Sequence, residues 1–135
     1  MAKLIDSSLW IDLTRARSPR VLKAFIAPHV NDSEACLAEP IIFEVLRHAT
    51  DDEAEKMTRQ FETMPLLASP ADLWSRGIEL GRACRRAGLT VGSIDLLIAA
   101  VALYHTAELV TFDVDFQKLG DVTGLRVKHL KRPTR

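Results

Sequence analysis

One segment of the sequence has almost no polar side with which to face water. Residues 94–106 read IDLLIAAVALYHT, and when they are drawn as a helix the apolar side chains lie nearly all the way round. Such a helix has to be buried in the middle of a fold, because it has no face to present to solvent. Ser93 stands directly before it, at a position where serine commonly caps a helix. The sequence therefore predicts a central buried helix with the other elements packed around it.

Short apolar segments alternate with helical patterns along the rest of the chain. This alternation predicts an α/β fold around a parallel sheet, because parallel strands need crossover connections between them. The expected strands are 3–5, 35–38, 66–67, 108–111 and 125–127, and the expected helices are 7–16, 19–26, 40–46, 51–64, 70–87, 94–106 and 114–119. The full length, residues 1–135, fits one domain, since domains commonly have about 100–150 residues.

The composition is that of a globular protein. Hydrophobic residues make up 47% and charged residues 27% of the chain, which excludes a disordered or collagen-like sequence. No apolar run is long enough to cross a membrane, and the opening MAKLIDSSLWID is too polar for a signal peptide. Cys36 and Cys84 belong to no C-x-x-C pair or histidine cluster, so we expect no structural zinc site. We therefore expect a soluble protein of the reducing cytoplasm, with no membrane partner.

The formal net charge is zero, but the charges are unevenly distributed. The last ten residues, RVKHLKRPTR, hold five of the 18 basic residues and no acidic residue, which leaves 13 basic against 18 acidic residues before them. A basic tail on an acidic body is able to contact phosphates, and it is equally common as a solvated terminus. The sequence leaves both interpretations of the tail open.

Four acidic residues fall where a parallel sheet would gather them. Asp6 and Asp113 each follow an expected strand at its carboxyl end, the edge at which open α/β sheets bind ligands. Asp95 opens the buried helix just before the second of these strands. Glu44 lies among the apolar residues 41–46, where a charged carboxylate needs a partner. Taken singly, each has a structural explanation, as a helix cap or as part of an exposed helix face.

Taken together, the four carboxylates have a chemical interpretation. Two carboxylates about 4 Å apart repel by about 4 kcal/mol at an effective dielectric constant of about 20. Protonation or a bound cation relieves this repulsion, and acid–base chemistry alone would need fewer acids. A set of oxygen ligands without Cys or His favours Mg²⁺ or Mn²⁺ over Zn²⁺. Such an ion activates water and neutralises a phosphate, so the pattern predicts metal-assisted phosphodiester hydrolysis.

Four segments of the chain resemble the motifs of the PIN-domain ribonucleases, most closely their VapC-type toxin branch. The segments are LIDSSLWID, EPIIFEVLRHA, SIDLLIAAVAL and LVTFDVDF, and their order and spacing extend the resemblance over nearly the whole chain. One departure is Asp-Ser-Ser in place of the common Asp-Thr-Ser, which keeps both hydroxyl groups. The resemblance implies a PIN-like three-layer fold, with a central parallel sheet of four to five strands flanked by helices. It also implies an endoribonuclease toxin of a type II toxin–antitoxin pair that cleaves structured RNA (tRNA or rRNA), forms a homodimer and is inhibited by a cognate antitoxin.

The resemblance also assigns roles to individual residues. Asp6, Glu44, Asp95 and Asp113 match the four acidic positions of the family. Asp6 and Asp95 are the expected direct ligands of Mg²⁺ or Mn²⁺, and Glu44 and Asp113 complete the site. Thr111 matches a supporting hydroxyl. Asp115 is either a fifth acid of the site or the cap of the following helix, and we favour the cap.

Substrate contacts are less clearly marked. A basic stretch follows the first helix, close to the expected site, and consists of Arg15, Arg17, Arg20 and Lys23. Such side chains position nucleic acid through its phosphates, although a solvated helix surface explains them equally well. We expect Trp10 and Trp74 to lie in the core or in a dimer interface, and not to stack on RNA bases.

Other classes fit the sequence less well. A phosphoacceptor receiver domain needs paired acids after the first strand and a lysine after a late strand, and both are missing. A haloacid-dehalogenase-like enzyme needs its D-x-D motif after the first strand, whereas this chain has Asp113 and Asp115 near its end. Two interpretations within the PIN fold stay open: a housekeeping nuclease, and a binding module that has lost its chemistry.

Overall fold

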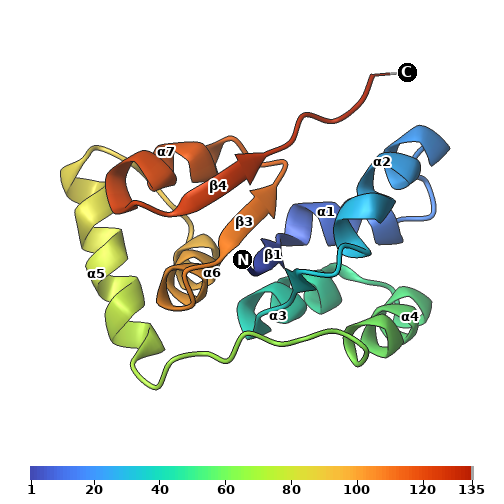
Figure 1. Cartoon of the computed structure of the whole chain (residues 1–135), viewed down its shortest axis with the longest axis horizontal. Coiled ribbons are helices and arrows are strands. Elements are labelled where there is room, and N and C mark those ends of the chain that lie inside the picture. The colour runs from blue at the N-terminus through green and yellow to red at the C-terminus, as the bar shows by residue number, and fades with distance from the viewer. Residues whose placement is uncertain (135) are drawn as a thin grey trace.

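The computed structural model describes residues 1–134, so Arg135, the last residue of the basic tail, lies outside the described residues. Within that range, four parallel strands and seven helices form an α/β fold (Figure 1). The strands are β1 (Lys3–Ile5), β2 (Ala35–Cys36), β3 (Glu108–Thr111) and β4 (Arg126–His129). The helices are α1 (Ser7–Thr14), α2 (Arg20–Val30), α3 (Glu39–His48), α4 (Asp51–Phe61), α5 (Leu73–Arg86), α6 (Ser93–Tyr104) and α7 (Asp115–Thr123). The predicted fold class is confirmed.

The order of the strands places β1 and β3 side by side. The strand order in the sheet is β2-β1-β3-β4. The chain therefore goes from β1 to β2 on one side of it, and later returns to place β3 and β4 on the other side of β1. Ile5 pairs with Val110, and the amide of Asp6 donates a 2.9 Å hydrogen bond to the carbonyl of Val110. The carboxyl ends of β1 and β3 therefore meet where the strand order reverses, which is the usual ligand position in such sheets.

The middle of helix α6 is buried, as its sequence predicts, whereas residues 94–97 are only partly buried and Ser93 and Tyr104 at its two ends are exposed. Its residues from Ile98 to Ala102 are all at most 2% exposed. Figure 1 shows α6 and the strands between α5 at one end of the molecule and α1, α2 and α4 at the other. Helix α5 packs closely on α6 through Gly77 and Gly81, where an added Cβ would lie 3.2 Å from a leucine side chain of α6. No helix among the described residues is both long and apolar enough to span a membrane.

Several element boundaries differ from the predicted ones. Gly92, not Ser93, precedes α6, and no side-chain hydrogen bond caps this helix. The expected strand at 66–67 is a single parallel bridge between Leu37 and Leu66. Helix α4 ends at Phe61, earlier than predicted, and this last side chain is buried in the core, where it packs edge-on against Trp10.

Helix α7 extends beyond the predicted end at Leu119. Gly120 lies inside the helix, where an added Cβ would stand only 2.8 Å from the carbonyl oxygen of Leu125. This glycine allows a close approach of α7 to the segment that leads into β4, and does not end the helix. The helix ends instead at Gly124, which adopts the left-handed conformation with φ of 79°. Strand β4 consequently begins at Arg126, one residue later than predicted.

Candidate active site at the carboxyl edge of the sheet

Asp6 lies buried at the carboxyl end of β1 and accepts two hydrogen bonds on one oxygen. Its side chain comes from the residue between β1 and α1, and the residue is 3% exposed. The hydroxyl of Thr111, at the end of β3, donates to Asp6 Oδ2 over 2.7 Å, and the hydroxyl of Ser8 donates to the same atom over 2.8 Å. Burial raises the pKa of Asp6, and these two hydrogen bonds oppose that rise.

The two hydroxyls also hold the backbone that follows β3. Thr111 Oγ1 accepts a 2.9 Å hydrogen bond from the amide of Asp113, and Ser8 Oγ accepts a 3.1 Å hydrogen bond from the amide of Phe112. Each hydroxyl therefore links Asp6 to the turn that carries Asp113. The supporting position predicted for Thr111 is in this network.

Ser8 is a member of the network that the sequence did not single out as a site residue. A serine after a strand and at a helix start is usually a cap, but the side chain of Ser8 turns to Asp6 and Phe112 instead. The signal in the sequence that could have identified it is Asp-Ser-Ser, in which a hydroxyl stands two residues after the acid. Only the pairing of β1 with β3 shows what this hydroxyl contacts.

Asp95 lies half-buried in the first turn of α6, in a strongly negative environment. Burial, followed by the charges of Asp6, Glu44, Asp113 and Asp115, raises the pKa of Asp95 to about 7. Glu44, from α3, also raises the pKa of Asp6. The structure therefore brings Asp6, Glu44 and Asp113 within electrostatic reach of Asp95, although the four acids come from four separate segments.

The acids do not form a compact set of ligands. Within residues 1–134, no group of three or more His, Cys, Asp or Glu side chains could hold a metal ion as the side chains stand. The ligand roles of Asp6, Glu44, Asp95 and Asp113 stay predictions. The observed arrangement concentrates negative charge at one edge of the sheet, and a hard cation is the simplest partner for such charge.

The predicted cap role of Asp115 is wrong. Asp115 is the first residue of α7, its side chain is exposed, and it lies 3.9 Å from the ammonium of Lys118. The carboxylate of Asp113 instead accepts a 2.9 Å hydrogen bond from the amide of Asp115. Asp113 therefore satisfies the free amide at the helix start, because it precedes the first turn and Asp115 lies within it.

The basic stretch spans the end of α1 and the start of α2. Arg15, Arg17 and Arg20 are exposed and Lys23 is half-buried. The ion pairs found in the described part of the chain involve none of these four side chains, so their charges are available to a ligand. Arg15 follows an eight-residue helix that starts next to Asp6, which places it about 12 Å along the helix axis from the acidic edge.

Removing the hydroxyl of Ser8 tests the network. We expect Ser8→Ala to lower the RNA cleavage implied by the sequence motifs about tenfold, because residues that orient a metal ligand, the role predicted for Ser8 towards Asp6, commonly have effects of at least this size. We also expect it to lower the free energy of unfolding by about 1 kcal/mol. Ser7→Ala is the matched control, since Ser7 is buried beside it and its hydroxyl has no hydrogen-bond partner in the described structure. Cleavage rates and urea unfolding curves measure both effects. Equal losses in the two variants would contradict the role of Ser8.

Comparison with known proteins agrees with this architecture. The family model described as "PIN domain" matches residues 3–122. The VapC ribonuclease Mb1587 of Mycobacterium bovis is 36% identical over 129 residues, covering 91% of this chain and 95% of that protein.

Solved structures share the fold at low sequence identity. The crystal structure of VapBC2 from Rickettsia felis, bound to a DNA fragment from its promoter, has a TM-score of 0.76 and 16% identity, and the match covers 97% of this chain and 100% of the other. Mycobacterium tuberculosis VapC20, a Sarcin-Ricin loop cleaving toxin, has a TM-score of 0.69 and 18% identity over 88% of this chain and 95% of its own. The family match over most of the chain and the sequence identity together establish that this protein belongs to the PIN domain family and, within it, to the VapC ribonucleases.

Proposed function

We propose that the protein is a Mg²⁺- or Mn²⁺-dependent endoribonuclease and the toxin of a type II toxin–antitoxin pair, acting on structured RNA such as tRNA or rRNA in the cytoplasm. The observation that carries the proposal is the acidic edge at β1, β3, α3 and α6, where the charges of four acids from three other segments reach Asp95. Two relatives support the proposal. The VapC ribonuclease of Mycobacterium bovis is 36% identical to this chain over 129 residues, and a Sarcin-Ricin loop cleaving toxin has the same fold.

The donor chemistry of the edge fits a hard divalent cation. All four acids offer carboxylate oxygens, which Mg²⁺ and Mn²⁺ prefer, and their mutual repulsion is relieved by positive charge. Mg²⁺ commonly keeps several waters and uses one or two carboxylates, so a cluster of three preformed ligands is not required. Asp6 and Asp95 would hold the ion directly, with Glu44 and Asp113 completing the site. When bound, the ion would supply activation of water and neutralisation of the scissile phosphate.

The chain's own residues orient these groups. Thr111 and Ser8 fix the carboxylate of Asp6 through one oxygen, and Asp113 is held at the end of β3 by the bond from its amide to Thr111. Arg15, Arg17, Arg20 and Lys23 are proposed to bind the RNA backbone, which positions the substrate without selecting its sequence.

Expression in bacteria tests the toxin role. We expect the wild-type protein to arrest growth and Asp6→Asn to relieve the arrest at equal protein level, because the substitution removes one proposed ligand charge. Sequencing of RNA ends from arrested cells identifies the cleaved RNA. Specific cleavage in cells that continue to grow would favour the housekeeping nuclease, and the absence of cleavage would favour the binding module.

An antitoxin and a second copy of the chain are the proposed protein partners. Structures related in fold are VapBC toxin–antitoxin assemblies, some of them bound to DNA, such as the complex from Salmonella typhimurium. By analogy with these assemblies, we propose a cognate antitoxin that inhibits the present chain.

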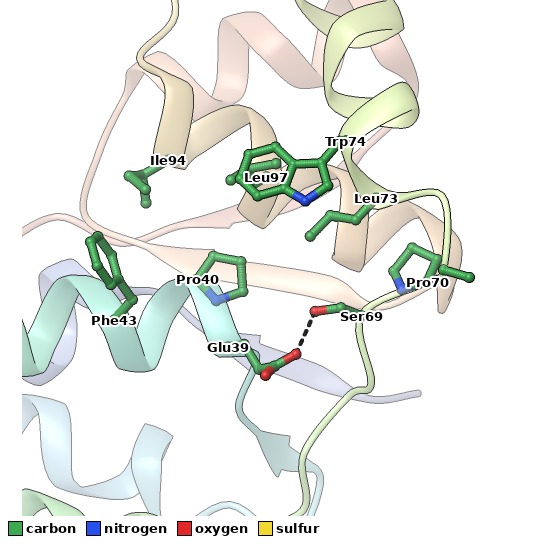
Figure 2. Close-up of a pocket in the computed structure, with 10 residues that line it drawn as sticks. Glu39, Pro40, Phe43, Ser69, Pro70, Leu73, Trp74, Ile94 and Leu97 are labelled. Atoms are coloured by element: carbon green, nitrogen blue, oxygen red, sulfur yellow. Dashed lines mark hydrogen bonds between the residues drawn. The ribbon is translucent and has the colours of Figure 1, made fainter.

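The surface proposed for homodimerisation is an apolar groove between α3, α5 and α6. Phe43 and Trp74 lie on opposite sides of it, with Leu97 at its floor, as Figure 2 shows. The groove has a volume of about 430 Å³ and continues along α5, past Ile78. Trp74 is 72%, Ile78 64% and Phe43 55% exposed, an unusual concentration of large exposed apolar side chains.

The charges at the ends of this groove favour a second copy as its occupant. Arg82 and Arg85 line the end near the C-terminus of α5, and Glu39 lies at the other end, where it accepts a hydrogen bond from Ser69. A two-fold axis near Ile78 would set two α5 helices antiparallel, so that the basic end of each copy faces the acidic end of the other. Such self-complementarity is what a two-fold dimer requires.

Charge reversal tests the dimer. We expect Arg85→Glu to convert a dimer into a monomer and the double variant Arg85→Glu with Glu39→Arg to restore it, because the second change re-creates opposite charges across the axis. Val21→Glu is the matched control, since this exposed residue lies on α2, away from the groove. Light scattering after gel filtration measures the mass. A monomeric wild-type protein, or a monomer in the control, would contradict this surface.

A further inference from the structure

The C-terminal segment after β4 leaves the sheet at the same edge as the acidic site. The amide of Leu130 donates a 2.8 Å hydrogen bond to the carbonyl of Thr111, which extends the pairing of β3 with β4 by one residue. Figure 1 shows the chain then running from β4 towards the side of the molecule that holds α1 and α2. The basic tail therefore passes over the turn that carries Asp113.

Arg132 attaches this segment to two other elements. Its Nε donates a 2.7 Å hydrogen bond to Oδ2 of Asp12 on α1, within an ion pair in which the Asp12 side chain is only 13% exposed. Its guanidinium carbon also lies 4.6 Å from the centre of the Phe112 ring, which is within the range of a cation–π contact. The same ring stacks on Phe25 of α2, with ring centres 6.2 Å apart.

Phe112 is the residue through which these contacts reach the site. Its amide donates to Ser8 Oγ, which in turn donates to Asp6. Its carbonyl oxygen lies 3.1 Å from Nε2 of His129. The ring and both backbone groups of Phe112 are therefore held, and the residue stands between Thr111 and Asp113 in the chain.

We propose that Arg132 is a positioning residue of the nuclease: through Phe112 it fixes the turn that carries Asp113 and the hydrogen bond from Ser8 to Asp6. The inference rests on the proposed metal-dependent cleavage of RNA. The role differs from that of a surface arginine that binds RNA, because the guanidinium of Arg132 is already engaged by Asp12 and Phe112. Loss of Arg132 would also leave the carboxylate of Asp12 without its partner.

Binding of Mn²⁺ without RNA separates these two roles. Calorimetry on the full chain is expected to show about fivefold weaker Mn²⁺ binding in Arg132→Ala, below the 10- to 100-fold effect usual for residues that touch a metal ligand directly. Arg132→Lys keeps the charge but lacks the planar group, so an intermediate loss is expected. Lys131→Ala removes a neighbouring exposed charge and is expected to leave Mn²⁺ binding unchanged. Circular dichroism confirms that each variant is folded; should Arg132→Ala not fold, Arg132→Lys decides the test.

The Asp12→Asn variant gives opposite results for the two roles. If Arg132 positions the turn, this variant weakens Mn²⁺ binding in the same direction as Arg132→Ala and leaves the KM for RNA unchanged. If Arg132 binds RNA phosphates, the freed guanidinium lowers the KM and Mn²⁺ binding does not change. Unchanged Mn²⁺ binding in Arg132→Ala, or in Arg132→Lys should the alanine variant not fold, would overturn the inference. Failure of the wild-type protein to cleave RNA with Mn²⁺ would instead overturn the proposed function.

Discussion

Asp95→Asn is expected to abolish RNA cleavage and at the same time to make the metal-free protein more stable. The variant keeps the shape of the side chain but removes a proposed metal ligand, so we expect a fall in cleavage rate of at least about 100-fold. It also removes a carboxylate that burial and four neighbouring acids destabilise in its charged form. The expected gain in the free energy of unfolding at pH 8 is about 1–2 kcal/mol, after allowance for the partial exposure of this group.

The stability gain should depend on pH in a defined direction. The pKa of Asp95 is raised from 3.8 to about 7 in the folded chain. Between these values the unfolded chain loses a proton that the folded chain keeps, so stability falls as pH rises from about 4 to 7 and is level above that. Asp95→Asn lacks this contribution. Urea unfolding of both proteins in EDTA at pH 5 and pH 8 measures this contribution to the free energy of unfolding. If Asp95→Asn is no more stable than the wild type at pH 8, the charged carboxylate of Asp95 does not destabilise the folded chain.

Removal of divalent metal is expected to have the second large effect. With EDTA present, the rate of RNA cleavage should fall at least about 100-fold. The acids at the carboxyl edge of the sheet would then hold no cation to activate water and neutralise the phosphate. Added Mg²⁺ should restore cleavage and should raise the free energy of unfolding, by about 2.7 kcal/mol at 100 times its Kd. Asp95→Asn should gain much less stability from Mg²⁺ than the wild type.

A matched ionic strength of KCl is the control for metal addition. Monovalent salt screens the repulsion among exposed charges but does not fill a ligand site. We therefore expect KCl to give a small gain in stability and no cleavage. Full RNA cleavage by purified protein in EDTA would exclude the metal-dependent reaction.

The local sequence predicted most elements but misplaced several of their ends. Residues 94–106 were expected to be buried because they lack a polar side, and the middle of α6, from Ile98 to Ala102, is buried accordingly. The end of α7 was predicted too early, since a glycine in sequence usually marks a helix end. Gly120 is needed instead for contact with Leu125, and such a contact between separate segments leaves no periodic signal.

The sequence predicted that the acidic residues lie at the edge of the sheet, but it did not predict which hydrogen bonds they form. The end of a strand is a local property, so Asp6 and Asp113 could be assigned to the edge of a sheet from their neighbours alone. The same local pattern could not distinguish Asp113 from Asp115 as the residue that satisfies the start of α7. It also gave no reason to place Arg132 against Phe112, 20 residues earlier in the chain.

The sequence by itself determined the α/β class, the buried helix and the four acids, because apolar periodicity and the residue types at element ends are local. Only the tertiary structure decided that β1 pairs with β3, that Ser8 and Thr111 share one oxygen of Asp6, and that the C-terminal segment closes over the turn after β3. The pairing of β1 with β3 and the bond from Thr111 to Asp6 join residues roughly a hundred positions apart. The bond from Ser8 to Asp6 is local, and Arg132 lies 20 residues after Phe112. The formation of the contacts between distant residues depends on the packing of whole elements, which no short stretch of sequence encodes.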